Sequence, residues 1–304
     1  MMAGNGNARS RGDRDAARDA RRIARSEAAR DHVAAMERTR SKDIERSHAG
    51  VMRFEASPKV QAEGCIPSIE MVDQDAVTVV LERGRGRAEF CDMALLDFAS
   101  FTTPGGGFMR GTMAQEESLC AESTLYNVLE REREWYGENR RRHINCELYK
   151  NRGIVVPAVR FARDRVHAFA DVLVVAAPNA RRAVAEYNVA DDILAQAMRD
   201  RIRFALSLAD TLGHERLVLG AFGCGVFGWE ALEVAEMFRS ELASGAHVAK
   251  EVIFAIPARR FDENLPKFSH VLATFPDPNP QGYRTPVKDE PVKEKDDDDW
   301  RRYL

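Results

Sequence analysis

Short apolar runs alternate with helical segments along most of this 304-residue chain. Five runs are rich in β-branched residues and bounded by glycine, proline or charge, which is typical of strands buried on both faces. They are AVTVVLE (76–82), MALLDFAS (93–100), DVLVVAA (171–177), RLVLGAF (216–222) and EVIFAI (251–256). Residues 114–133 lack proline and glycine, and apolar residues recur at helical spacing from Leu194 to Leu212, so both segments are predicted to be helices. The alternation predicts a three-layer α/β domain that binds its ligand at the carboxyl ends of the strands.

The chain divides into three regions by composition. Residues 1–50 are dense in Arg, Asp, Glu and Ala and predict a charged helical extension that packs by one narrow stripe. Residues 51–275 hold the apolar runs and form the predicted core domain. Residues 276–304 contain five of the twelve prolines and the acidic ending DDDDWRRYL, so we expect a disordered tail, with a docking peptide as the less favoured alternative.

Composition excludes several classes of protein. Hydrophobic residues make up 44% and charged residues 31% of the chain, as in soluble globular proteins, and the net charge of −3 argues against sequence-specific nucleic-acid binding. The five cysteines form no CxxC pair and the seven histidines show no metal-ligand spacing, so we expect no structural zinc site and no disulfide framework. We find no signal-peptide pattern and no run of about 18 apolar residues, and we therefore expect a cytoplasmic protein without membrane association.

A glycine cluster follows the second apolar run. Gly105, Gly106 and Gly107 permit positive φ and bring backbone N–H groups close to a ligand, for which a phosphate or a ribose is the natural candidate. Seven residues later, QEE (115–117) falls on the first turn of a predicted helix. The helix dipole favours acidic residues there in any protein, but neighbouring positions point about 100° apart, so one or two of the three could face a ligand.

A second glycine-rich loop, GAFGCGVFG (220–228), again joins an apolar run to a helical segment. Such loops wrap a diphosphate with backbone amides at a helix start, although this one matches neither the P-loop nor the dinucleotide fingerprint. We assign Phe222 to the core and Phe227 to the site as a wall against a sugar or base. Together the loops and the acids predict a nucleotide-sugar site with a glutamate acid/base.

At these residues the chain resembles the bacterial-type poly(ADP-ribose) glycohydrolases, which are macrodomain proteins. The family signature is GGG, six to eight residues and QEE, and the match extends over LDFASFTTPGGGFMRGTMAQEESLCAESTLY (96–126). The resemblance implies a macrodomain-like mixed sheet flanked by helices, and hydrolysis of ribose–ribose O-glycosidic bonds without a metal or a cofactor. It also implies poly(ADP-ribose), ADP-ribose and ADP-ribosylated proteins as partners.

The resemblance also implies roles for individual residues. Glu117 would be the catalytic acid/base, and Glu116 would hold the ribose beside the scissile bond. Asn179 would either contact the substrate or cap the turn that follows it. The remaining implied substrate contacts are Asp97, Gly105, Gly106, Gly107, Gln115, Gly223, Cys224, Gly225, Val226, Phe227, Gly228 and Phe254.

Two other functions would fit the same pocket. One is a hydrolase that removes ADP-ribose from a protein side chain or another acceptor, and the other is a non-catalytic ADP-ribose reader. A reader has no use for QEE, which favours an enzyme. The basic run 131–143 could grip polymer phosphates, but we favour an ordinary solvated loop.

Overall fold

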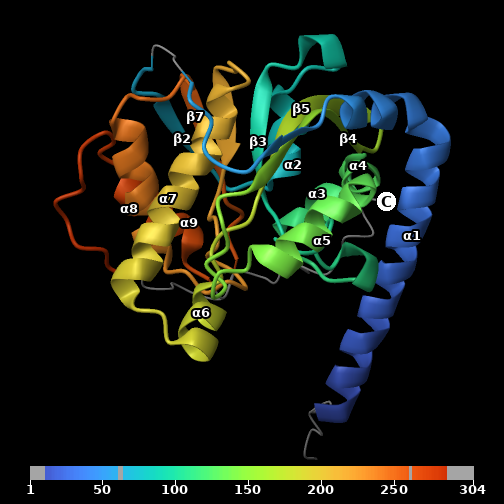
Figure 1. The fold of residues 1–304 in the computed structure, drawn as a ribbon, viewed down its shortest axis with the longest axis horizontal. Coiled ribbons are helices and arrows are strands. Elements are labelled where there is room, and N and C mark those ends of the chain that lie inside the picture. The colour runs from blue at the N-terminus through green and yellow to red at the C-terminus, as the bar shows by residue number, and fades with distance from the viewer. Residues whose placement is uncertain (1–10, 61–63, 260–261, 286–304) are drawn as a thin grey trace, which may run out of the picture.

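The computed structural model describes residues 11–60, 64–259 and 262–285. Its centre is one seven-stranded mixed sheet in the order β1-β4-β5-β3-β6-β7-β2, with helices on both faces (Figure 1). The strands are β1 (Met52–Phe54), β2 (Ser68–Val72), β3 (Met93–Phe98), β4 (Gly153–Arg163), β5 (Val166–Val175), β6 (Arg216–Leu219) and β7 (Glu251–Ala255). The predicted three-layer α/β class is confirmed.

Helices and short 3-10 turns connect these strands. The α-helices are α1 (Arg11–Ala49), α2 (Ala76–Arg83), α3 (Gln115–Ala121), α4 (Leu125–Leu129), α5 (Arg133–Arg142), α6 (Ala180–Tyr187), α7 (Asp191–Asp210), α8 (Ala231–Ala243) and α9 (Asn264–Leu272). The 3-10 turns are η1 (Ala88–Phe90), η2 (Phe108–Arg110) and η3 (Glu130–Glu132). Within the described ranges, none of these helices combines the length and the apolar character that a membrane crossing requires.

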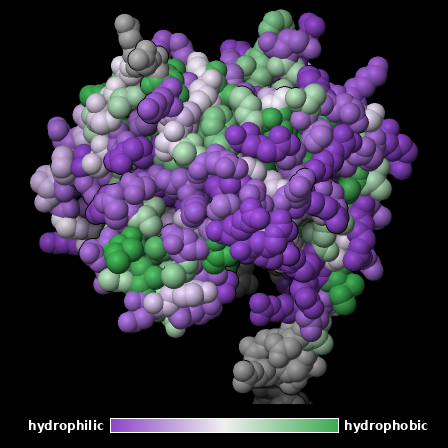
Figure 2. Space-filling view, viewed as in Figure 1, coloured by the Kyte–Doolittle hydropathy of each residue, from purple (hydrophilic) through white to green (hydrophobic). Residues whose placement is uncertain are grey.

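Central strand β3 shows how the sheet is buried on both faces. Ala94 and Leu96 contribute to a hydrophobic cluster with α7, α8 and α9, whereas Met93 and Leu95 face a second cluster with α2, α3 and α4. β3 pairs in parallel with β5 and with β6, so the carboxyl ends of these three strands meet at one edge. Polar residues cover most of the molecular face seen in Figure 2.

One predicted strand is wrong, because residues 76–82 form helix α2. Asp75 caps this helix by accepting a hydrogen bond from Thr78 N at 2.9 Å. The buried residues Ala76, Val77, Val79 and Val80 fall on one face at helical spacing. An apolar run this short fits either a buried strand or a buried helix, and here the cap and the tertiary packing decide.

The amino-terminal helix is more than a solvated extension. α1 kinks at Arg40 and packs along β4, α4 and η2, with Ile44 and Ala29 fully or almost fully buried (Figure 1). His32 Nε2 lies 2.9 Å from the carbonyl oxygen of Ser123, and the Ser47 hydroxyl donates to Ala158 O at 3.0 Å. α1 is thus an integral part of the domain surface.

The predicted carboxyl-terminal boundary falls a few residues early. Arg239 Nη1 donates to Pro276 O at 2.7 Å, and Asn279 Nδ2 donates to His270 O at 2.7 Å. Residues 276–279 are therefore held by α8 and α9 rather than forming part of a free tail. The rest of the predicted tail, from residue 286 onward, lies outside the described residues.

Candidate active site

The GGG segment and the two glutamates of α3 lie against each other. A Cβ on Gly106 would come within 2.7 Å of both Glu116 Oε2 and Glu117 Oε1. Gly105 and Gly106 adopt φ of +61° and +58°, a left-handed conformation that favours glycine. The glycines are therefore required both by the backbone path and by the closeness of the carboxylates.

Each glutamate has one oxygen anchored by a backbone amide. Gly107 N donates to Glu117 Oε1 at 2.7 Å, and Ser100 N donates to Glu116 Oε2 at 2.7 Å. Only 5% of Glu117 and 3% of Glu116 is exposed. The second oxygen of each, Glu117 Oε2 and Glu116 Oε1, has no hydrogen-bond partner within the part of the chain that the structure describes.

A third carboxyl group, Asp97 of β3, completes the cluster. It is fully buried, and neither of its oxygens has a hydrogen-bond partner among the described residues. Burial and then the charge of Glu117 raise the pKa of Asp97 well above its ordinary value. Burial, followed by the charge of Asp97, likewise raises the pKa of Glu116. Both shifts favour the protonated forms of Asp97 and Glu116, and shifted carboxyl groups of this kind suit acid–base chemistry.

Gln115 joins α3 to the backbone of β3. Its side-chain nitrogen donates to Leu96 O at 2.9 Å, and its side-chain oxygen accepts from Phe98 N at 2.8 Å. Both polar atoms are thus bonded to the backbone of β3, on either side of Asp97. Gln115 therefore positions α3 on the strand, so that the glutamates and Asp97 come together, and its contact with a substrate stays a prediction.

The second glycine loop lies beside the first. β3 and β6 are paired neighbours, and a Cβ on Gly220 would meet the Phe98 ring at 2.9 Å. Gly223 and Gly228 have φ of +78° and +82°, while Gly225 and Val226 are exposed at the tip. The structure therefore brings both predicted loops to one edge of the sheet, as expected for a ligand with sugar and phosphate parts.

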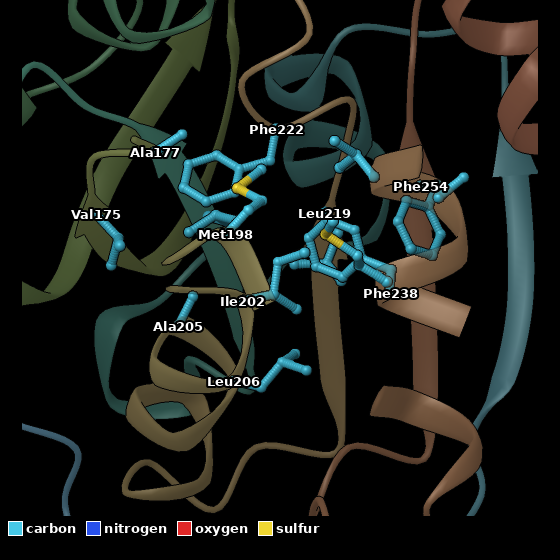
Figure 3. Packing of buried hydrophobic residues seen from close by; sticks show 14 of the residues in the cluster. Val175, Ala177, Met198, Ile202, Ala205, Leu206, Leu219, Phe222, Phe238 and Phe254 are labelled. Carbon is cyan, nitrogen blue, oxygen red and sulfur yellow. The ribbon is translucent and has the colours of Figure 1, made fainter. Parts of the chain in front are cut away.

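The aromatic and thiol side chains of this loop divide between core and surface. Phe222 is fully buried beside Met198, which confirms its assignment to the core (Figure 3). Phe227 is half-buried, with its ring centroid 6.4 Å from that of Tyr149 in an edge-to-face arrangement. Burial raises the pKa of the Cys224 thiol to about 12, so any substrate contact from Cys224 is made as a neutral group.

Phe254 is a correction to the sequence prediction. It is fully buried in the core, with its ring centroid 5.5 Å from Phe238 and 5.6 Å from Phe268 (Figure 3). A ring without exposed surface cannot stack on an adenine. The sequence placed Phe254 near the carboxyl end of β7, but it could not show which face of the sheet the side chain occupies, because β7 is buried on both faces.

Asn179 caps α6 by accepting a hydrogen bond from Arg182 N at 3.2 Å, the second of its two expected roles.

Several residues near the site were missed by the sequence analysis. Tyr149 stacks on Phe101, with ring centroids 4.5 Å apart and planes 8° from parallel, next to Phe227. It ends a segment in which four non-glycine residues, Asn145, Cys146, Glu147 and Tyr149, have positive φ. Such strained backbone clusters at functional sites, but no sequence pattern announces it.

Tyr136 of α5 also borders the carboxyl cluster. The residue is buried, and its hydroxyl has no hydrogen-bond partner in the described ranges. Burial first, and then the charges of Glu116 and Asp97, raise the pKa of Tyr136 well above its usual value. A neutral phenol at this place is available as a hydrogen-bond donor to the cluster or to a ligand.

The basic run 131–143 forms part of η3 and the whole of helix α5 and is not the loop that we expected. Arg131 pairs with Glu37 and Glu45 of α1, at 3.0 and 3.1 Å. Arg140 Nη2 donates to Thr102 O at 2.7 Å, in the segment that leads to the glycines. Arg131 and Arg140 are therefore engaged in contacts within the domain, which favours a structural role for these two side chains over polymer binding.

Comparison with known proteins shows which family this chain resembles. The sequence model described as "Microbial-type PARG, catalytic domain" matches residues 20–164. A comparison with curated proteins found no match.

Solved structures extend the similarity over most of the chain. The poly(ADP-ribose) glycohydrolase (PARG) from Thermomonospora curvata is 27% identical, with 81% of this chain and 98% of that chain covered and a TM-score of 0.70. Its complex with the inhibitor ADP-HPD gives 27% identity, the same coverage and a TM-score of 0.68. The PARG from Deinococcus radiodurans in complex with ADP-ribose is 26% identical, with 77% of this chain and 98% of that chain covered and a TM-score of 0.66. The resemblance read from the GGG–QEE motif is thereby confirmed: residues 20–164 match the catalytic domain of the microbial-type poly(ADP-ribose) glycohydrolases, and the fold is similar to that of two bacterial members.

Proposed function

We propose that this chain hydrolyses the ribose–ribose O-glycosidic bond of poly(ADP-ribose) and releases ADP-ribose, with Glu117 as the general acid/base. The observation that carries the assignment is the pair of buried glutamates held against Gly106. Each has one oxygen anchored by a backbone amide and one oxygen without a hydrogen-bond partner among the residues that the structure describes. The similarity to microbial-type poly(ADP-ribose) glycohydrolases indicates poly(ADP-ribose) as the substrate class. ADP-ribosylated proteins are the acceptors that we expect to carry the polymer.

Glu117 is the better placed of the two glutamates for proton transfer. Its anchored oxygen is fixed by Gly107 N, at the end of the glycine segment proposed to surround the ribose. In the protonated state it donates to the departing 2′-oxygen, and as a carboxylate it then accepts a proton from the attacking water. Glu116, held by Ser100 N, orients the ribose next to the bond that breaks.

The second loop supplies binding and electrostatic stabilisation. Backbone amides between Gly223 and Gly228 would hold the diphosphate, and Phe227 would pack on the distal ribose. The negative diphosphate, held close to the reacting carbon, offsets the positive charge that develops in an oxocarbenium-like transition state.

The experiment compares polymer hydrolysis by the wild type, Glu117→Gln and Glu132→Gln. Glu132 is a matched control because it is also buried, at 3% exposure, but it pairs with Arg53 and lies outside the site. We expect Glu117→Gln to lose about 10²–10⁴-fold in the rate of ADP-ribose release, with binding of free ADP-ribose retained. Glu132→Gln should keep most of the activity. Comparable cleavage by Glu117→Gln would refute the assignment.

The same assay separates the two alternatives. Release of ADP-ribose from mono-ADP-ribosylated protein, without attack on polymer, would indicate a hydrolase for a protein-linked group. Binding of ADP-ribose by the wild type with no release from either substrate would indicate a reader.

A further inference from the structure

A second group of chemically reactive side chains lies at the opposite end of β3 from Asp97. Cys91 Sγ lies 3.3 Å from Asp171 Oδ1, and His214 Nε2 lies 3.0 Å from Asp171 Oδ2. The candidate ligand atoms of the three residues all lie within 4.8 Å of one another. Asp171 is buried, whereas Cys91 and His214 are half-buried, so solvent reaches the group.

The sheet topology makes this group rigid. β3 lies between β5 and β6, with Ala94 opposite Asp171 and Met93 opposite Arg216. Cys91 and His214 each precede that β3–β6 pair by two residues, at the amino end of their strands. Six residues of extended chain separate Cys91 from Asp97, which places the group on the order of 20 Å from the carboxyl cluster.

We propose that Cys91, Asp171 and His214 bind one Zn²⁺ ion, with water as the fourth ligand. Thiolate sulfur, imidazole nitrogen and carboxylate oxygen are the atoms that zinc takes in proteins, at about 2.0–2.3 Å. Tetrahedral ligands at those lengths lie about 3.2–3.8 Å from one another. Cys91 Sγ lies 3.3 Å from Asp171 Oδ1, His214 Nε2 lies 3.0 Å from Asp171 Oδ2, and the three candidate ligand atoms lie within 4.8 Å of one another. Side-chain rotations would therefore bring the sulfur, the nitrogen and one carboxylate oxygen to the tetrahedral spacing.

A backbone contact holds the carboxylate in orientation. β4 has a register irregularity between Val156 and Val159, and Ala158 at this point has a φ of +46°. This irregularity turns Ala158 N toward Asp171 Oδ1, to which it donates at 2.7 Å. Asp171 Oδ2 is thereby directed to His214. Outer contacts of this kind are what fix the first ligands of a metal site.

The neighbouring positive charge is compensated. Arg216, the first residue of β6, is paired with Asp92 and also donates to Arg83 O at 2.7 Å. Without metal, burial and the charge of Asp171 raise the pKa of Cys91 to about 12, so the thiol keeps its proton and donates a hydrogen bond to the carboxylate. Zinc binding would displace that proton to solvent and join three adjacent strands. Its effect is therefore on stability, at a distance from the catalytic chemistry.

The test uses the full-length protein without an affinity tag. Cobalt(II) is titrated in as a spectroscopic substitute for zinc, and absorption is recorded in the near ultraviolet and the visible. We expect one equivalent to give a thiolate-to-cobalt charge-transfer band, which zinc then removes by displacement. We also expect zinc to raise the midpoint of thermal unfolding by at least about 3 °C, because it binds the folded state.

Cys91→Ser and His214→Gln should abolish the charge-transfer band or weaken cobalt binding at least tenfold. Cys65→Ser is the matched control, since Cys65 is also half-buried but lies outside the group, and it should leave the titration unchanged. Alkylation of the wild type provides a check that needs no variant: zinc should protect Cys91 but not the exposed Cys146. Absence of the band in the wild type, its persistence in Cys91→Ser, or equal alkylation of Cys91 with and without zinc would overturn the proposal and leave a hydrogen-bonded trio.

Discussion

Gly107 N donates a 2.7 Å hydrogen bond to Glu117 Oε1, so the last glycine of the GGG segment is joined directly to a glutamate in the first turn of α3. The two residues are ten positions apart in the chain, separated by η2 and the turn that follows it. This contact makes the glycine segment and the helix one unit. The position of the proposed catalytic carboxylate therefore depends on the path of the backbone as much as on the side chain.

Gly106→Ala should remove most of the activity. Its added Cβ would lie 2.7 Å from both glutamates, at a φ of +58°. Gly213→Ala is the control, since Gly213 has a similar φ of +67° but open space around it, and it should cost only about 1 kcal/mol in unfolding free energy. Polymer hydrolysis measured with thermal unfolding checks the pair. Equal loss of activity in both variants would show that conformation alone, and not the carboxylates, matters at Gly106.

Asp97→Asn should stabilise the protein more at pH 8 than at pH 5. The raised pKa of Asp97 means that its contribution to stability is present below the unfolded pKa, near 4, and is lost as pH rises through the folded value. Asparagine carries no charge at either pH, and each unit of raised pKa is worth about 1.4 kcal/mol. Urea unfolding at both pH values measures the difference. The exposed Asp192→Asn serves as control, and the same shift in both variants would contradict burial as the cause.

Phe227→Ala should weaken substrate binding, whereas Phe222→Ala should lower the unfolding free energy. Phe227 is half-buried beside Tyr149, so its loss should raise KM about tenfold with little change in stability. Phe222 is fully buried, and its truncation should cost about 3–5 kcal/mol in unfolding free energy. Steady-state kinetics and urea unfolding separate the two effects. A destabilised Phe227→Ala with unchanged KM would assign that ring to the core.

The double variant Arg25→Ala/Ser26→Ala should lower kcat. Arg25 Nε donates to Gly111 O at 2.8 Å and the Ser26 hydroxyl donates to Met109 O at 2.7 Å, so α1 holds the turn between the glycines and the glutamates. Loss of two hydrogen bonds, at about 1 kcal/mol each, should reduce kcat about tenfold through misplacement of Glu117. Arg30→Ala, an exposed change on the same helix, should have no effect on kcat. Unchanged kcat in the double variant would confine α1 to a packing role.

His247→Gln should flatten the fall in stability above neutral pH. Burial lowers the pKa of His247, but the hydrogen bond from its Nδ1 to Asp210, 2.8 Å long, and the charges of Asp210 and Glu241 outweigh burial and raise it. The stabilisation is fully present below the unfolded pKa of about 6.5 and is lost as pH rises through the higher folded value. Thermal unfolding from pH 6 to 9 tests this. An identical pH profile in the variant would contradict the assignment.

The fold class and the candidate catalytic motif could both be predicted from the amino-acid sequence. Buried strands such as 93–98 and 251–255 need continuous apolar runs, and the approach of backbone to carboxylates needs glycine, so both leave a mark in the chain. The run 76–82 was the exception, since a short apolar run fits a strand or a helix, and here the Asp75 cap and the tertiary packing select the helix.

The orientation and the neighbours of individual side chains could be read only from the three-dimensional structure. It turned Phe254 into the core, bonded Gln115 to the backbone of β3, and packed Tyr136 and Tyr149 beside the site. It also gathered Cys91, Asp171 and His214, which lie 80 and 43 residues apart in the chain. The physical reason is the same in each case: local sequence sets backbone preference and apolar character, whereas strand pairing and the packing of helices on the sheet set which side chains become neighbours.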